Sequence, residues 1–261
     1  MSTISPCQHA ASLNRLKTLW AEDRVALGAF VTIPSVEIVQ LMASAGLDWI
    51  LIDMEHGAIS ASAAHALIAA TSGTSLVPLV RVAGPTINDA KLPLDLGAFG
   101  INFPMTSSRQ AAETAVKAVR NPPEGERNWG PFYAPLRWGL SMQDYLDRAN
   151  GNVLAIGTIE HSDALTAIDD IVNTPGLDVL AIGAGDLATS MGLRGEIDHP
   201  RVQACVQRIE DSIRGSGVIM GGVANTPAMI QAKKERGYRL LCIGFDWSLL
   251  QRGISSILAA A

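Results

Sequence analysis

Two carboxylates stand where a metal site could form. Glu160 and Asp186 end consecutive short apolar segments of the chain. If these segments are neighbouring parallel strands, both carboxylates project into one mouth, where like charges repel unless a cation lies between them. Oxygen ligands without a cysteine or histidine cluster suit a hard divalent cation such as Mg²⁺ or Mn²⁺, with Co²⁺ as a third option. The alternative is that each carboxylate pairs with Arg81 or caps a helix.

Three further residues could move a proton or hold a substrate. His56 follows Asp53 and Glu55, and its ordinary pKa of about 6.5 suits a general base near neutral pH, although a structural role is the alternative. Arg81 ends the next apolar segment, where it could hold a carboxylate, polarise a carbonyl or form a structural salt bridge. Asp95 lies between two leucines, so its charge needs a partner. We expect Asp53 and Glu55 to support these groups from a second layer.

The turn Gly183-Ala184-Gly185-Asp186 precedes a short helical pattern over residues 187–191. Free N–H groups at a helix start, approached closely through glycines, suit a carboxylate or a phosphate. The glycine fingerprint of dinucleotide sites, the Walker A sequence and the GxSxG elbow are absent from the sequence. All lysines fall on expected helices rather than at strand ends, which argues against Schiff-base chemistry. His161 adjoins Glu160, but strand alternation would turn its side chain away from the interior.

Strand and helix patterns alternate along the chain and would position these residues. The expected strands span residues 25–33, 49–55, 76–82, 100–105, 153–160, 178–186, 218–224 and 239–246. The expected helices span residues 9–22, 35–45, 61–70, 88–96, 109–119, 141–149, 164–172, 202–214, 228–236 and 249–258. Most helices end at a glycine, and the strands are continuously apolar, as in a parallel sheet covered on both faces. The pattern predicts one α/β domain over residues 1–261, a (β/α)8 barrel with an extra N-terminal arm and helix at 1–22, rather than an open doubly wound sheet.

Composition narrows the classes of partner and location. The net charge is −5, and the chain has no run of Lys or Arg, which disfavours nucleic acid and an anionic membrane surface. No apolar stretch approaches the roughly 20 residues of a membrane span, and the first residues lack a secretory pattern. The three cysteines are dispersed, so neither a disulfide framework nor a zinc site is implied. We expect a cytoplasmic protein.

One connection interrupts the alternation. Residues 121–139 are rich in proline, glycine and aromatic residues and are too long for a simple link, so they form a lid or an oligomer contact. The segment carries Trp129, Phe132, Tyr133 and Trp138, which are costly to leave in water and typical of an interface core. We therefore expect a symmetric homo-oligomer.

Five segments carry a resemblance to a known family. They are Leu51-Ile-Asp-Met-Glu-His-Gly57, Val80-Arg-Val82, Leu94-Asp-Leu-Gly-Ala98, Ile159-Glu160, and Ile182-Gly-Ala-Gly-Asp-Leu187 followed by Ser190-Met-Gly192. Together they resemble the HpcH/HpaI aldolase family, metal-dependent class II pyruvate aldolases on a (β/α)8 barrel. The similarity runs in order and spacing over residues 25–250. It implies a homohexamer arranged as a trimer of dimers.

The resemblance also implies roles for single residues. Glu160 and Asp186 correspond to the metal-binding carboxylates, Arg81 to the arginine at the keto oxygen, and the backbone from Ala184 to Asp186 to the cradle of the pyruvate carboxylate. His56 corresponds to the catalytic base. Asp95 corresponds to the acid that pairs with this histidine.

The implied reaction is reversible aldol chemistry on a 2-keto acid, pyruvate or hydroxypyruvate. The metal acidifies C3, the base removes a proton, and the enolate then adds to an aldehyde. The aldehyde is expected near Pro104, Met105 and Phe245. Arg127 resembles the arginine of the family's loop and, with Trp129, is expected to reach the substrate from a neighbouring subunit.

The chain departs from the family pattern at three places, which leaves the aldehyde unidentified. His161 and Thr158 stand where Thr and Gln are common, and the turn on the sixth strand reads Gly-Ala-Gly-Asp instead of Gly-Pro-x-Asp. Two other functions compete with the aldolase: a related barrel lyase acting on an acyl-CoA ester, and a non-catalytic binding barrel. The first would want a basic groove for the nucleotide, and the second would not need both carboxylates, the histidine and the arginine together.

Overall fold

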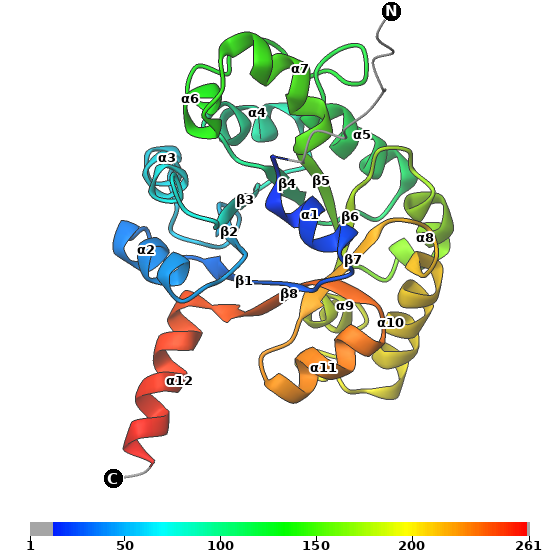
Figure 1. Ribbon diagram of the computed structural model, residues 1–261. Helices are drawn as coiled ribbons and strands as arrows, with labels where there is room; N and C mark the ends of the chain where they lie inside the picture. Colours follow the sequence, from blue (N-terminus) through cyan, green and yellow to red (C-terminus); the bar gives the residue numbers. More distant parts are fainter. Residues whose placement is uncertain (1–12, 260–261) are drawn as a thin grey trace, which may run out of the picture.

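Eight parallel strands close into a barrel in the computed structural model, which describes residues 13–259. Each strand pairs with the next one along the chain, and the last pairs with the first (Figure 1). The strands are β1 (Ala26–Val31), β2 (Trp49–Asp53), β3 (Val77–Arg81), β4 (Gly100–Phe103), β5 (Leu154–Ile159), β6 (Val179–Ile182), β7 (Ile219–Val223) and β8 (Tyr238–Phe245). The predicted fold class is therefore confirmed.

Helices surround the barrel, apart from two at the ends of the described chain. They are α1 (Arg15–Ala21), α2 (Val36–Ser44), α3 (Ala61–Ala70), α4 (Ile87–Asp95), α5 (Arg109–Val119), α6 (Ala134–Trp138), α7 (Met142–Asn152), α8 (Ala164–Val172), α9 (Ala184–Ser190), α10 (Pro200–Ile213), α11 (Pro227–Glu235) and α12 (Asp246–Leu258). The last helix, α12, does not lie along the barrel but projects away from it (Figure 1). None of the helices between residues 13 and 259 combines the length and the apolar character that crossing a membrane requires.

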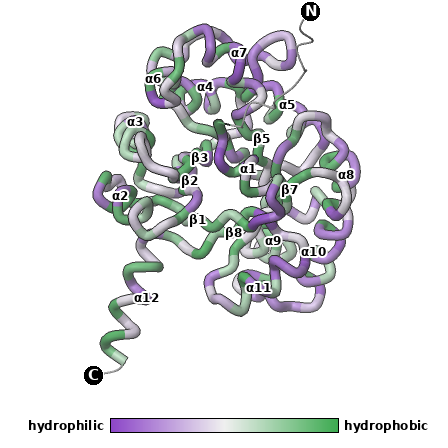
Figure 2. Tube along the Cα trace, viewed as in Figure 1, coloured by the Kyte–Doolittle hydropathy of each residue, from purple (hydrophilic) through white to green (hydrophobic). Residues whose placement is uncertain are grey.

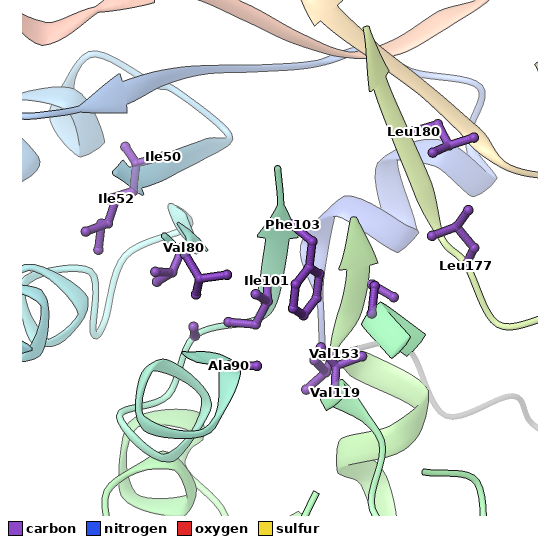
Figure 3. Packing of buried hydrophobic residues seen from close by; sticks show 14 of the residues in the cluster. Ile50, Ile52, Val80, Ala90, Ile101, Phe103, Val119, Val153, Leu177 and Leu180 are labelled. Atoms are coloured by element: carbon purple, nitrogen blue, oxygen red, sulfur yellow. The ribbon is translucent and has the colours of Figure 1, made fainter. Parts of the chain in front are cut away.

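The core has two layers, because successive residues of a strand face opposite sides. On β2, Ile50 and Ile52 point outward into the layer between strands and helices, where Val80, Ile101 and Phe103 of the next strands also pack (Figure 3). The inward-facing residues form a second cluster. Leu16 and Leu19 of α1 belong to that inner cluster, so α1 covers the amino-terminal end of the barrel. Every residue of β2, β3 and β5 is buried, as expected of a parallel sheet covered on both faces.

Three of the glycines predicted to end helices, Gly46, Gly97 and Gly237, directly follow a C-cap residue and have positive φ angles. Gly73, Gly176 and Gly217 also have positive φ angles, but they lie two or three residues beyond the C-cap, in the connections. Helices α3, α5 and α8 have the predicted bounds. Residues 1–12, which include the first part of the expected N-terminal arm and helix, lie outside the described residues.

One predicted strand boundary was wrong, and one short helix was not predicted. The sixth strand does not reach Asp186 but ends at Ile182, and the charged residue lies in the first turn of α9. The aromatic connection 121–139 contains a short helix, α6, that the pattern did not indicate. Its Trp138 is buried and stacks on Phe99 at a centroid distance of 4.1 Å, so one of the four aromatic residues belongs to the core. Trp129 and Phe132 remain exposed, by 61% and 70%.

Candidate functional site

A cavity of about 550 Å³ opens at the carboxyl ends of the strands and continues into the barrel. Arg81 at the end of β3, Glu160 just after β5 and Phe245 at the end of β8 line its mouth. The turn from Gly183 into α9 forms the adjoining wall and contributes Asp186. The strand-end charges predicted to meet therefore lie around one cavity.

Arg81 is held in a fixed position by Asp53. The guanidinium donates from Nε to Oδ1 at 2.9 Å and from its terminal nitrogen to Oδ2 at 2.6 Å, the two-point geometry that orients an arginine. The Asp53 carboxylate also accepts the backbone N–H groups of Glu55 and His56. Burial raises the pKa of Asp53, but the hydrogen bonds and charge of Arg81 outweigh burial and leave that pKa below its usual value. The guanidinium carbon of Arg81 lies over the Phe30 ring, 4.9 Å from the ring centroid.

Glu55 is the second carboxylate on this arginine. Its Oε2 lies 3.2 Å from Arg81 Nε, yet this buried oxygen has no hydrogen-bond donor of suitable geometry among the described residues. Burial raises the pKa of Glu55, and the charges of Asp53 and Asp186 add to that effect against the opposing charge of Arg81. Negative charge thus exceeds positive charge in this part of the mouth.

Glu160 is buried at the mouth and is oriented by backbone. Its Oε1 accepts the N–H of Met105 at 2.6 Å, and Met105 has a φ of 52°, a conformation uncommon for a residue with a side chain. A Cβ atom on Gly183 would lie 2.8 Å from Glu160 Cβ, so only glycine leaves room for this carboxylate. Burial raises the pKa of Glu160, and the charges of Glu55 and Asp186 raise it further.

The donor set at the mouth fits a hard divalent cation. Glu160 and Asp186 face the same space together with Glu55, and their mutual repulsion is relieved when a cation lies between them. No three His, Cys, Asp or Glu side chains converge on one point within residues 13–259. A cation here would therefore take two carboxylates from the chain and leave positions for water or substrate oxygens, a common arrangement for Mg²⁺.

His56 lies at the rim, 70% exposed, with Nε2 3.8 Å from Glu55 Oε2. It lines a second, smaller cavity of about 310 Å³ together with Glu160, His161 and Asp186. The base candidate and the metal-ligand candidates therefore face a common space. His161, expected to turn away, contributes to that wall.

Two expected partners of the site lie elsewhere within one chain. Asp95, expected to pair with His56, instead accepts a hydrogen bond of 3.0 Å from Arg127. Arg127, expected to reach a neighbour's substrate, is 2% exposed and lies over the Tyr145 ring. This guanidinium has two nitrogens without a hydrogen-bond acceptor among the described residues. Within one chain the loop therefore folds back onto α4 and α7 and pairs this aspartate with Arg127. The pairing of Asp95 with His56 and the contact of Arg127 with a neighbour's substrate stay predictions.

The residues expected on the aldehyde side are divided. Phe245 lines the larger cavity and Met105 the smaller one, whereas Pro104 is buried outside both linings. Asn102 was missed by sequence reasoning. It lies at the end of β4, lines the larger cavity and accepts a hydrogen bond of 2.8 Å from Thr158. The available signal was an amide in an otherwise apolar strand.

Comparison with known proteins decides the family. A model of the HpcH/HpaI aldolase/citrate lyase family matches residues 26–252. The chain belongs to this family. The hydroxypyruvate/pyruvate aldolase of Sagittula stellata is 31% identical over 241 residues, 91% of this chain and 94% of that protein. The 4-hydroxy-2-oxo-heptane-1,7-dioate aldolase of Salmonella dublin is 32% identical over 250 residues, 94% of each chain.

Solved structures of HpcH/HpaI proteins share the fold. A family member from Burkholderia cenocepacia superimposes with a TM-score of 0.87 at 31% identity, over 95% of this chain and 98% of that chain. As a member of the HpcH/HpaI family with aldolase relatives along almost its whole length, the chain is a carbon–carbon lyase.

Proposed function

We propose that the chain catalyses reversible aldol cleavage of a 4-hydroxy-2-oxo acid to pyruvate or hydroxypyruvate and an aldehyde. The observation that carries this proposal is the arrangement of Glu160, Asp186 and Arg81 around one cavity in a chain of the HpcH/HpaI family. Two carboxylates that can hold a metal ion, beside the positively charged guanidinium of Arg81, suit a substrate that carries two adjacent oxygen groups, as a 2-oxo acid does. The names of the two aldolase relatives favour the same reaction class.

Glu160 and Asp186 are the proposed holders of a divalent cation, Mg²⁺ or Mn²⁺ with Co²⁺ as a third option. When bound, the cation supplies Lewis-acid polarisation of the 2-oxo group. Glu160 reaches the mouth already oriented by the Met105 N–H, and Gly183 keeps the space beside it open. The chain thus prepares the anionic oxygens before any ligand enters.

Arg81 is proposed to hold the keto oxygen, where negative charge develops during proton removal. Its bidentate pairing with Asp53 fixes the guanidinium plane, so little reorganisation is needed as that charge grows. The backbone N–H groups of Ala184, Gly185 and Asp186 are proposed to receive the substrate carboxylate. Phe30 and Phe245, whose rings lie 4.8 Å apart, exclude water from this side.

His56 is proposed to move the proton at C3. It is exposed at the rim of the smaller cavity and has Glu55 as its nearest carboxylate. Within one chain Glu55 is therefore the carboxylate proposed to orient the His56 imidazole, since Asp95 is hydrogen-bonded to Arg127. Release of the aldehyde then occurs through the open side that Met105 and His161 flank.

One assay tests this function. Metal-stripped protein is incubated with pyruvate or hydroxypyruvate and a panel of aldehydes, with and without Mn²⁺, and adducts are measured. Adduct formation only with Mn²⁺ supports the proposal. The alternative is a lyase acting on an acyl-CoA ester, and cleavage of such an ester without any aldol adduct would replace the proposal.

Assembly and location belong to the same proposal. We expect a homo-oligomer, a hexamer by analogy with the family, in the cytoplasm. Small-molecule substrates are the expected ligands, and neither nucleic acid nor a membrane is an expected partner.

A further inference from the structure

The larger cavity extends beyond the barrel to the far face of β7. Gly221 lines it on the barrel side, and Gly222, the next residue, lines it on the helix side. We call the helix-side part the outer lobe; its lining includes Gln203, Val206, Gly222, Met229, Lys233, Arg236 and Tyr238. Space that opens onto both faces of one strand connects the outer lobe with the mouth that holds Arg81 and Asp186.

The outer lobe lies between the outer face of the sheet and helix α11. The Tyr238 ring and Lys233 Nζ lie directly against Gly222, so that a Cβ atom at this position would approach them to 2.8 Å and 3.8 Å. Helix α11, which covers this side, has no buried residue, although barrel helices ordinarily pack an apolar face onto their strands. Lys233 occupies the position on α11 from which an apolar side chain would fill the gap.

Lys233 brings a positive charge that no neighbouring carboxylate pairs with. Its Nζ lies 4.0 Å from the centroid of the Tyr238 ring, and it makes no salt bridge within residues 13–259. The nearby Glu210 is fully buried and is already bonded, with Oε2 accepting from Arg236 and Oε1 from Tyr238. Arg236 and Glu210 thus pair with each other, and Lys233 is left without an ion-pair partner among the described residues.

Other charged groups do not neutralise this lysine. Burial and then the charge of Arg236 lower the pKa of Lys233, and Glu210 only partly opposes them. Asp198 also lines the cavity, but it is exposed on the connection to α10, where water and salt screen it. An anion entering the lobe would meet Lys233 as an ammonium donor, with the apolar side chains of Val206 and Met229 around it.

We propose that the outer lobe is a second binding site, distinct from the mouth, for the carboxylate group of a small aliphatic acid. Lys233 Nζ donates to the carboxylate, and the walls of the lobe receive the aliphatic chain. The carboxylate is either the far end of an extended substrate whose reacting end lies at the mouth, or a separate free acid. Only the first source rests on the proposed aldolase function.

The test uses the intact protein and glutarate as the probe, with its diamide as the uncharged control. The chain has five lysines, so ¹³C- and ¹⁵N-labelled lysine gives few side-chain signals to follow by NMR. Glutarate is expected to shift the Lys233 signal and to raise the pKa of its ammonium, because a nearby anion favours the charged form. Lys234, adjacent in sequence and exposed, is the internal control and is expected to stay unchanged.

A Lys233→Met variant is expected to bind glutarate roughly 10- to 100-fold more weakly, the loss typical of a hydrogen bond to a charged group. Lys234→Met is the matched control and should bind as the wild type does. Equal shifts of Lys233 and Lys234, no shift of either, or binding of the diamide as tight as that of glutarate would each overturn the proposal. Because the wild-type signals decide the first part, poor folding of the variant leaves the test intact.

Kinetics separate the two sources of the carboxylate. If it is the tail of the substrate, Lys233→Met raises KM for an aldehyde bearing a terminal carboxylate and leaves KM for propanal unchanged. If it is a separate acid, glutarate binding depends on Lys233 while both KM values stay unchanged. Loss of the aldol reaction in the wild type would contradict the proposed function alone, since the NMR measurement needs no turnover.

Discussion

The mouth of the barrel holds carboxylates in a charged state that burial opposes. Glu55 and Glu160 both have raised pKa values, with burial as the largest cause, and the charge of the Arg81 guanidinium opposes this effect at both. Asp53 takes that guanidinium in two hydrogen bonds and has a lowered pKa. The remaining negative charges repel one another, and a cation held by Glu160 and Asp186 would offset that repulsion. Function and stability therefore make opposite demands on the same residues.

Glu160→Gln should make the metal-free protein more stable while removing metal affinity and activity. A carboxyl whose folded pKa is raised contributes stability that is fully present below its unfolded pKa and is lost as pH rises through the folded pKa. At pH 7 to 8 the wild-type protein has lost this stability because Glu160 is ionised, whereas the neutral amide of Glu160→Gln does not ionise. The melting temperature of the variant should rise by roughly 2–4 °C for each kcal/mol regained, and the difference should shrink as the pH approaches 4.5.

With Mn²⁺ present, the wild type should become the more stable of the two proteins. The cation stabilises a folded protein that binds it, so the wild-type melting temperature should rise with Mn²⁺ and that of Glu160→Gln should not. Asp186→Asn should likewise lose metal affinity, and Glu196→Gln, on the exposed surface, is the control that should change neither quantity. Unchanged metal affinity in both mouth variants would remove the proposed cation site.

His56→Ala should lower kcat by roughly 10² to 10⁴, the usual contribution of a general acid–base, with KM for pyruvate little changed. The reason is that His56 lies at the rim, outside the contacts that hold the keto acid. Steady-state kinetics measure the effect, and His65→Ala, whose ring contacts Tyr133 and Arg137 away from both cavities, is the control. Turnover within a factor of about two of the wild type would assign the proton to Glu55 instead.

At the scale of elements, the site depends on a close approach between the end of β5 and the turn into α9. Gly183→Ala would place a Cβ atom 2.8 Å from Glu160 Cβ, so we expect a lower melting temperature and weaker Mn²⁺ binding. Gly185→Ala is the matched control two residues on, because nothing lies within 4 Å of its added Cβ. Alanine also favours helix over glycine, so this second variant should be as stable as the wild type or more so. Equal losses in both would mean that α9 as a whole, not the contact with Glu160, limits stability.

The sequence pattern alone predicted the barrel, and it predicted that the charged residues at the strand ends lie near one another. Apolar runs and helix-ending glycines are local signals, and strand-end charges then meet because parallel strands end at one edge. The pattern placed Asp186 on a strand because an apolar run gives no signal for where a strand stops within a glycine-rich turn. It could not pair Asp95 with Arg127, 32 residues apart, since that contact exists only after the loop folds back. Nor could it show that β7 leaves a lobe behind Gly222, which depends on the packing of α11.

At the scale of the whole molecule, α12 is a helix without a place on its own barrel. It projects away from the strands, and hydrophobic positions recur along it (Figures 1 and 2). Only Asp246 at its start is buried, through its bonds to the backbone of Thr32 and Ile33. Leu250, Ile254, Ile257 and Leu258 are each more than half exposed. A helix of 13 residues is marginal in water alone, so this one needs a surface to cover its apolar face.

We therefore expect α12 to pack against a second copy of the chain, which is a second reason to expect a homo-oligomer beside the exposed aromatic residues of the 121–139 connection. Ile254→Ser with Ile257→Ser should lower the mass measured by light scattering, because the apolar contact is lost. Trp129→Ser with Phe132→Ser tests the exposed part of the 121–139 loop in the same way. If only the Ile254→Ser/Ile257→Ser variant dissociates, the interface is formed by α12 and the loop residues are a lid beside the site. If only the Trp129→Ser/Phe132→Ser variant dissociates, the interface lies over the loop and α6. A wild-type protein that is monomeric and fully active would contradict both, since neither apolar surface would then be covered by a partner.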